Sequence, residues 1–186
     1  MPRYFAFLRA NNVGGHNVKM DHLRELFKSL KFTSVETFIA SGNVIFDSRS
    51  RNSKALESRI EEHLCAALGY EVATFLRTDD ELTEISHYKP FTDSVLKSAV
   101  AINIGFVRDA ISDEVERALA MLNSEIDQFH THKREVYWVS RMRQSESKFS
   151  NAVFERLLKG KATFRGLNTI TRLATKYLTQ NTGFRK

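Results

Sequence analysis

The chain has 186 residues, a length that fits one large domain or two small ones. Hydrophobic residues make up 42% and charged residues 27%, which is typical of a globular protein and excludes an intrinsically disordered one. One cysteine, Cys65, excludes an internal disulfide framework and a cysteine-based zinc site. The N-terminus predicts a strand rather than a signal peptide, and no apolar run is long enough to span a membrane. We therefore expect a cytoplasmic protein that does not associate with membranes.

The net charge of +6 is unevenly distributed. Residues 133–186 contain 13 Lys and Arg against 3 Asp and Glu, whereas residues 1–132 contain 15 against 19. Such a basic block predicts an acidic partner such as nucleic acid, a nucleotide or an anionic surface. The alternative is a solvated surface that happens to be basic, because no aromatic-rich RNA-binding motif accompanies the charge.

The first half of the chain predicts the order strand, helix, strand, strand, helix, strand, helix. Apolar residues alternate in the predicted strands and recur every three or four positions in the predicted helices. The segments are a strand at 4–8, a helix at 20–30, strands at 35–40 and 44–47 around a Ser41-Gly42-Asn43 turn, a helix at 56–68, a strand at 71–77 and a short helix to about 87, with a capping box from Thr78 to Glu81.

The same order begins again after a polar linker at Lys89-Pro90. The second set of segments is a strand at 99–107, a helix at 112–122, strands at 126–132 and 135–140, a helix at 149–159, a strand at 162–165 and a helix at 168–178. An Ala-Thr-Phe sequence occurs at 73–75 and again at 162–164, in both cases in a strand that leads into a helix. The repeated order and this match indicate a duplication.

The repeat predicts an α+β fold of two tandem ferredoxin-like βαββαβ-type units, each with an extra helix, packed into one compact body. The expected domains are residues 1–90 and residues 91–186, the second with the basic C-terminal third. Right-handed crossovers make the first two strands of each unit parallel, with the third strand antiparallel between them. The loop after the first strand and the turn at 41–43 are then expected at the same end of the sheet.

Several segments resemble a known family over nearly the whole chain. They are Leu-Arg-Ala-Asn-Asn-Val-Gly-Gly at 8–15, Met20 with Leu23-Arg24, Phe-Ile-Ala-Ser-Gly-Asn-Val-Ile-Phe at 38–46 and Thr-Phe-Arg-Gly-Leu-Asn-Thr at 163–169. The resemblance is to the DUF 1697 family, which typically has Leu-Arg-Gly-Ile-Asn-Val-Gly-Gly, Ser-Gly-Asn-Val and Thr-x-Arg-Asn-Trp-Asn-Thr. Ala10-Asn11 and Gly166-Leu167 depart from this pattern, so a ligand contact made by the family's Trp would be absent here. The resemblance implies a fold and no activity.

The loop at 11–19 ends where a helix is predicted to begin. Two glycines allow the backbone to approach a ligand, and the free amides of a helix N-terminus favour an anion. The candidate ligand-binding residues are Arg9, Asn12, Gly14, Gly15, Ser41 and Asn43. Neither a Walker loop nor a Gly-x-Gly-x-x-Gly motif occurs. The alternative is that Asn and Gly only shape the connection.

Cationic residues of the last third are candidates for a basic surface. They are Lys133, Arg134, Arg141, Arg143, Lys159, Lys161 and Arg165. The segment that contains Arg165, Asn168 and Thr169 is explained more simply by a helix N-cap and solvated charge.

His130 and His132 face one side of a predicted strand. A metal site needs three or four converging ligands, so exposed strand histidines are favoured. We expect no metal and no cofactor.

These features favour a protein that binds a phosphate-bearing ligand, with nucleic acid as the largest class of such partners. One alternative is an enzyme acting on a small anionic metabolite or nucleotide, with Arg9, Asn12 and Ser41 orienting the substrate. No acid, base or nucleophile can be assigned for such an enzyme. Another alternative is a protein-interaction module, whose sign would be an exposed apolar patch. The oligomeric state does not follow from these features.

Overall fold

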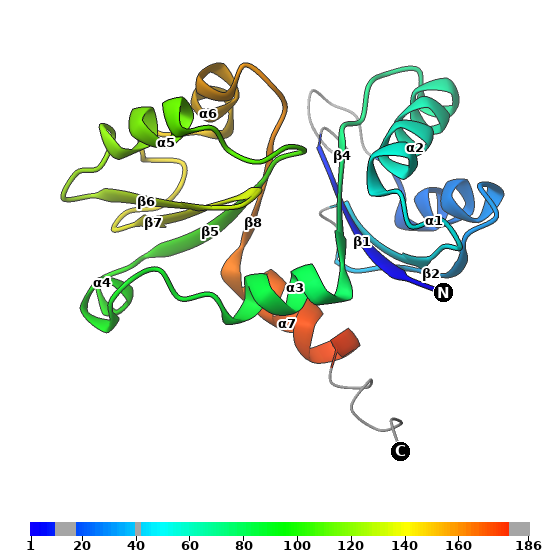
Figure 1. Ribbon diagram of the computed structural model, residues 1–186, viewed down its shortest axis with the longest axis horizontal. Helices are drawn as coiled ribbons and strands as arrows, with labels where there is room; N and C mark the ends of the chain where they lie inside the picture. Colours follow the sequence, from blue (N-terminus) through cyan, green and yellow to red (C-terminus); the bar gives the residue numbers. More distant parts are fainter. Residues whose placement is uncertain (10–17, 40–41, 179–186) are drawn as a thin grey trace. The chain divides into compact units, whose positions relative to one another are not determined.

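The computed structural model describes residues 1–9, 18–39 and 42–178 (Figure 1). The chain divides into two compact units, Met1–Leu82 and Thr83–Lys186. The sequence predicted this division after residue 90, whereas the units meet within helix α3 (Asp79–His87). Within the described residues, no helix combines the length and the apolar character needed to cross a membrane.

The first unit contains a four-stranded antiparallel sheet in the order β2-β3-β1-β4. Its elements are β1 (Arg3–Leu8), α1 (Met20–Ser29), β2 (Thr33–Thr37), β3 (Asn43–Asp47), α2 (Ser53–Leu68), β4 (Thr74–Thr78) and α3. Because β3 is antiparallel to both β1 and β2, those two strands run in the same direction. The strand directions predicted from the βαββαβ order are therefore confirmed.

The second unit repeats this arrangement in a sheet of order β6-β7-β5-β8. Its elements are α4 (Asp93–Lys97), β5 (Ala101–Phe106), α5 (Asp113–Ala120), β6 (Asp127–His132), β7 (Glu135–Ser140), α6 (Asn151–Leu158), β8 (Thr163–Gly166) and α7 (Leu167–Leu178). The α+β class and the duplicated element order are confirmed. Helix α4 lies between the linker at Lys89-Pro90 and β5, where no helix was predicted, and the Thr92 hydroxyl caps it by accepting a hydrogen bond from the Val95 amide.

Each unit has its own hydrophobic core between one face of its sheet and two helices (Figure 1). In the first unit, α1 and α2 cover a face that includes Tyr4 and Leu8. In the second unit, α5 and α6 cover the fully buried ring of Trp138, the one tryptophan of the sequence. The Trp138 indole N–H donates to Asp127 Oδ1 at 2.8 Å, so the polar atom of this ring is satisfied.

Side chains also satisfy the outward amides of the strands at the sheet edges. The Leu76 amide of β4 donates to Glu57 of α2 at 2.8 Å. In the second unit, the Phe129 amide of β6 donates to Asn123 Oδ1 at 2.8 Å. These bonds cover groups that would otherwise be available to pair with another chain.

Two local predictions around the strand ends have different outcomes. The capping box is confirmed, because the Thr78 amide donates to Glu81 Oε2 at 2.9 Å and the Glu81 amide donates to Thr78 Oγ1 at 3.3 Å. The strand predicted at 35–40 is displaced along the chain, since β2 spans Thr33–Thr37 and Ile39 has a φ of 50°. That left-handed conformation is unfavourable for a β-branched residue and lies just beyond the end of the strand.

Candidate functional site

The loop after β1 contains most of the ligand-binding residues predicted in the first unit. Asn12, Gly14, Gly15 and Ser41 lie outside the described residues. The flanking residues are close together, since the Leu8 amide donates to the Gly42 carbonyl at 2.9 Å. The end of β1 and the turn before β3 therefore lie at the same end of the sheet.

Asn43 and Arg9 border this loop in the structure. The Asn43 side chain is buried, and its Nδ2 donates to the Phe38 carbonyl at 3.1 Å. The Phe38 amide donates back to the Asn43 carbonyl at 3.0 Å, so Asn43 closes the β2–β3 connection. The geometry gives Asn43 a structural role in this connection, and its predicted ligand contact stays a prediction. Arg9 is half-buried, and its amide donates to the Ala73 carbonyl at 2.8 Å.

Arg165 was predicted on a basic surface, but it is only 8% exposed. It stands opposite the buried Ile104 in the β5–β8 pair, and directly opposed residues share one face of a sheet. Its Nη1 donates to Thr163 Oγ1 at 2.8 Å and to the Phe164 carbonyl at 2.9 Å. Burial lowers the pKa of the Arg165 guanidinium to about 10, so the group stays protonated at neutral pH.

The N-cap predicted after Arg165 is also wrong. Helix α7 begins at Leu167, so Asn168 and Thr169 lie inside its first turn.

Lys133 and Arg134, in the turn between β6 and β7, are engaged within the second unit. Lys133 Nζ forms an ion pair with Glu84 Oε2 at 2.6 Å, and Arg134 Nη1 donates to the Arg108 carbonyl at 3.2 Å. These contacts hold both cations, so they are less suited to an external anion than an unengaged side chain.

The two strand histidines belong to the same group of contacts. His132 Nε2 lies 2.8 Å from Glu84 Oε1, and His130 Nε2 lies 2.8 Å from the Tyr88 hydroxyl. The Tyr88 ring stacks on His132 with centroids 4.2 Å apart. Hydrogen bonds with Lys133, the larger cause, and with His132 hold the pKa of the Glu84 carboxyl below its ordinary value. Across the described residues, no three His, Cys, Asp or Glu side chains gather in an arrangement that could hold a metal ion.

Arg141 and Arg143 are exposed at the end of the second sheet where β5 begins. Arg141 follows Ser140, which pairs with Ala101 at the start of β5, and its Nε donates to Ser98 Oγ at 3.2 Å. The turn between α6 and β8 lies at the other end, because Thr163 pairs with Phe106. The length of β5, roughly 17 Å at the usual rise per residue, separates the two ends.

Exposed apolar side chains lie beside Arg141. Val100 is 61% exposed and Ile126 is 40% exposed, and the Arg141 amide donates to the Ile126 carbonyl. Met121, at the end of α5, is 86% exposed. Single apolar residues of this kind are common on protein surfaces, so they give weak support to the protein-interaction hypothesis.

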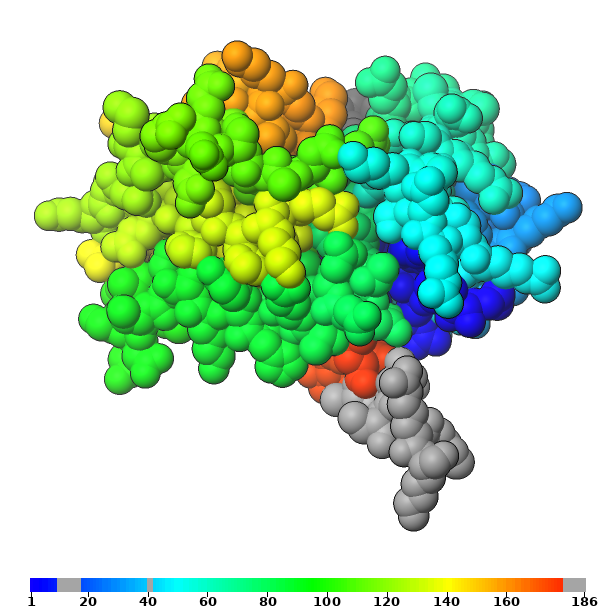
Figure 2. Space-filling model, viewed as in Figure 1, coloured from blue at the N-terminus to red at the C-terminus, as the bar shows by residue number. Residues whose placement is uncertain are grey.

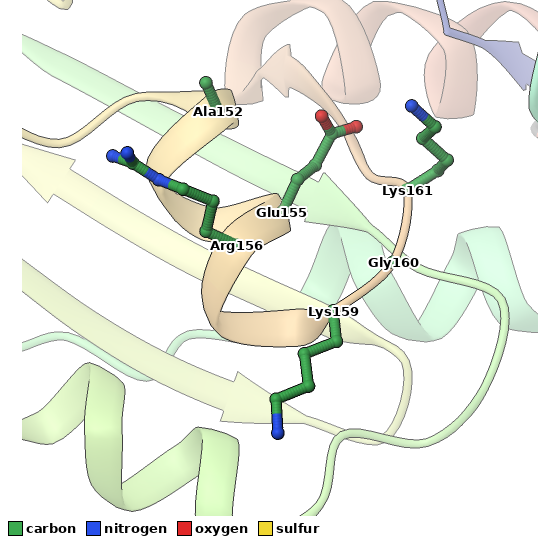
Figure 3. A pocket seen from close by; sticks show the side chains of 6 residues that line it. All are labelled: Ala152, Glu155, Arg156, Lys159, Gly160 and Lys161. Carbon is green, nitrogen blue, oxygen red and sulfur yellow. The ribbon is translucent and has the colours of Figure 1, made fainter.

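The clearest cationic feature is the turn that connects α6 to β8. We call Arg156, Lys159 and Lys161 the basic turn. They line an open depression of about 500 Å³ together with Ala152, Glu155 and Gly160 (Figure 3). Atoms of α6 (orange) lie at the molecular surface in the space-filling view (Figure 2).

The local sequence explains why the chain turns here. Lys159 adopts the left-handed conformation that ends a helix, with a φ of 53°, and its amide donates to the Arg156 carbonyl. The Gly160 amide then donates to the Glu155 carbonyl at 3.2 Å. Glu155 also accepts a hydrogen bond from the Ala162 amide through Oε1 at 3.0 Å. This carboxylate is thereby fixed to the start of β8.

The three side chains of the basic turn are exposed. Within the part of the chain that the structure describes, none of them takes part in a hydrogen bond or an ion pair. They extend from the turn in different directions (Figure 3). The arrangement is therefore an open, positively charged surface on which phosphate oxygens can reach several donors.

The sequence identified Lys159 and Lys161 as candidates but missed Arg156. A usable signal was present, because Arg156 precedes Lys159 by three positions on a predicted helix and such residues are neighbours on a helix surface. The engagement of Lys133 by Glu84 was not foreseeable, since 49 positions separate the two residues.

Comparisons with known proteins identify a family and support the fold. Residues 1–137 match the family described as "Protein of unknown function (DUF1697)". The chain belongs to this DUF1697 family. The family suspected from the sequence is thus confirmed over residues 1–137, whereas the segment at 163–169 lies outside the match. The DUF1697 match ends before the basic turn, which lies outside the matched segment.

One solved structure similar to this DUF1697 protein is "conserved bacterial protein SP0830 from Streptococcus pneumoniae". It has a TM-score of 0.69 and 21% sequence identity, and the match covers 94% of this chain and 97% of that chain. At this identity the likeness shows a shared fold. No curated protein matches the sequence.

Proposed function

We propose that the protein binds a phosphate-bearing ligand at the basic turn, with nucleic acid as the leading class. The observation that carries this proposal is the group formed by Arg156, Lys159 and Lys161, three exposed cations without an intramolecular partner in the described chain around one open depression. Arginine and lysine are the usual donors to phosphate oxygens, and their charge also raises the rate of encounter with a polyanion.

A structural role explains only part of this group. The carbonyl end of a helix favours nearby positive charge, so α6 itself stabilises Lys159 and Arg156. Lys161 lies beyond the last turn of α6, where the helix dipole has little effect. Its side chain is exposed and lines the same depression. A ligand that carries several phosphates and contacts all three side chains accounts for this placement.

The first test is an NMR titration of the intact protein with inorganic phosphate. We expect amide shifts to change at residues 159–162 and to be lost in the triple variant Arg156→Ala, Lys159→Ala, Lys161→Ala. A matched control removes three other exposed cations at the opposite end of the sheet, with Arg141→Ala, Arg143→Ala and Lys148→Ala. The control should keep the response.

Two results of this titration would contradict the proposal. Unchanged amide shifts at residues 159–162 would remove the basic turn as an anion site. Changes confined to Leu8, Arg9 and Gly42 would move the site to the loop after β1 and support the alternative of an enzyme on a small anionic metabolite.

A cytoplasmic location is also part of our proposal, and the single exposed thiol of Cys65 supports it.

A further inference from the structure

We infer that the ligand of the basic turn is double-stranded nucleic acid, bound through the phosphates of its backbone without recognition of base sequence. This inference rests on the proposed function and narrows its ligand class. The reasons are the shape of the basic turn, the chemistry of its lining and the placement of the aromatic side chains.

The shape of the basic turn does not suit a mononucleotide. Sites for small ligands are concave and bury most of the ligand, with apolar and aromatic walls around a few polar groups. Here the depression is open and its lining is charged, with Ala152 as the one apolar side chain among its six residues. The three cations diverge (Figure 3), which fits phosphates spread along a polymer better than a single phosphate group.

The aromatic side chains argue against a single strand. Proteins that bind single strands stack successive bases on exposed aromatic rings. No Phe, Tyr or Trp is exposed in the described part of the chain. The aromatic residues nearest to the basic turn in sequence, Phe154 and Phe164, pack on each other in the core with ring centroids 5.7 Å apart. A duplex keeps its bases stacked internally and offers phosphates on its outside.

The lining also predicts binding without sequence preference. Contacts from Lys and Arg to phosphates position a protein on a duplex but carry no information about the bases. Binding of this kind weakens with salt, because each neutralised phosphate releases condensed counterions. Three contacts predict a slope of log K against log salt of about −2.7.

The test is fluorescence anisotropy of the full chain with labelled duplexes of two unrelated sequences and with the corresponding single strands, at several salt concentrations. We expect equal affinity for both duplexes, weaker binding of the single strands and a salt slope that becomes shallower by about 0.9 for each cation removed from the basic turn. The triple variant at Arg141, Arg143 and Lys148 should keep the slope.

The outcomes separate this inference from the proposed function. Tighter binding of single strands, or a strong preference for one duplex sequence, would overturn the inference. Absence of duplex binding, combined with phosphate-induced shifts at residues 159–162, would overturn the inference and leave the proposed function standing. Absence of both responses would overturn both.

Discussion

Arg77 and Arg165 occupy corresponding positions in the last strand of the two units. Each donates from Nη1 to the carbonyl of the preceding residue, at 2.8 Å for Arg77 and 2.9 Å for Arg165. Arg77 stands opposite Phe5 in β1, and Arg165 stands opposite Ile104 in β5. Both arginines are buried, so each unit keeps a cation on the sheet face away from its two covering helices.

This correspondence changes the register of the repeat. The sequence aligned Ala-Thr-Phe at 73–75 with the same residues at 162–164, but the arginines align Leu76 with Phe164. Leu76 and Phe164 both pack in the cores under the helices. A second pair of contacts agrees, because the Thr74 amide donates to Glu61 as the Ala162 amide donates to Glu155. A shift of one residue in a strand moves every side chain to the other face.

Replacement of Arg165 is expected to act on stability rather than on ligand binding. Arg165→Ala should lower the free energy of unfolding by about 1.5–3 kcal/mol for each charge-assisted hydrogen bond lost. Arg165→Met should cost less, because it fills the space without burying a charge. Urea unfolding followed by Trp138 fluorescence gives both values. Equal losses of unfolding free energy in the two variants would show that neither the volume of the side chain nor the desolvation of its charge affects stability at this position.

The carboxylate of Glu57 is expected to stabilise the β4 edge. Glu57→Ala leaves the buried Leu76 amide without this acceptor, which should cost about 1–3 kcal/mol. Glu57→Gln keeps an acceptor oxygen and should retain most of the stability. Hydrogen exchange at the Leu76 amide checks the mechanism, since it should accelerate in Glu57→Ala far more than in Glu57→Gln. Similar exchange in both variants would contradict it.

A side chain at position 105 is expected to destabilise the second unit. A Cβ at this position would lie 2.6 Å from Cε1 of Phe164, the residue opposite in β8. Gly105→Ala should therefore cost about 1–3 kcal/mol through overpacking. Phe164→Leu removes the obstructing ring, so the double variant should be more stable than the two single losses predict. Simple additivity in the double-mutant cycle would exclude this contact as the cause.

Glu84 is expected to titrate below the ordinary glutamate range. Its folded pKa is lowered from 4.5, so its contribution to stability is present above that value and is lost as the pH falls through the folded pKa. Lys133 is the larger cause, so Lys133→Met should raise the pKa of Glu84 more than His132→Asn does. NMR titration of the Glu84 carboxyl carbon measures both shifts. The reverse order would make His132 the dominant partner.

The order of elements was predictable because hydrophobic periodicity extends over whole helices and strands. Met20–Ser29, for example, buries Leu23 and Phe27 at helical spacing. The ends of elements were less predictable, because they depend on single backbone conformations such as that of Ile39. Helix α4 was missed because it buries none of its residues and therefore has little apolar periodicity to detect.

The candidate site was predictable in its charge but not in its membership. Arginine is usually exposed, so residue type alone predicts Arg165 at the surface. Arg165 is buried because the strand register places it opposite the buried Ile104. Lys133 is occupied by a residue from the distant helix α3. Local sequence shows neither the register in which strands pair nor which distant side chains the fold brings into contact.

Trp138 and Cys65 lie in different units of the chain. Trp138 is enclosed in the core of the second unit, and Cys65 is exposed on α2 of the first. Intrinsic tryptophan fluorescence therefore senses the second unit alone, and a thiol-reactive dye attaches to the first unit alone. Energy transfer between the indole and a dye on Cys65 would follow the separation of the two units in solution. The sequence thus contains an intrinsic fluorophore in the second unit and a unique labelling site in the first, so the measurement needs no substitution.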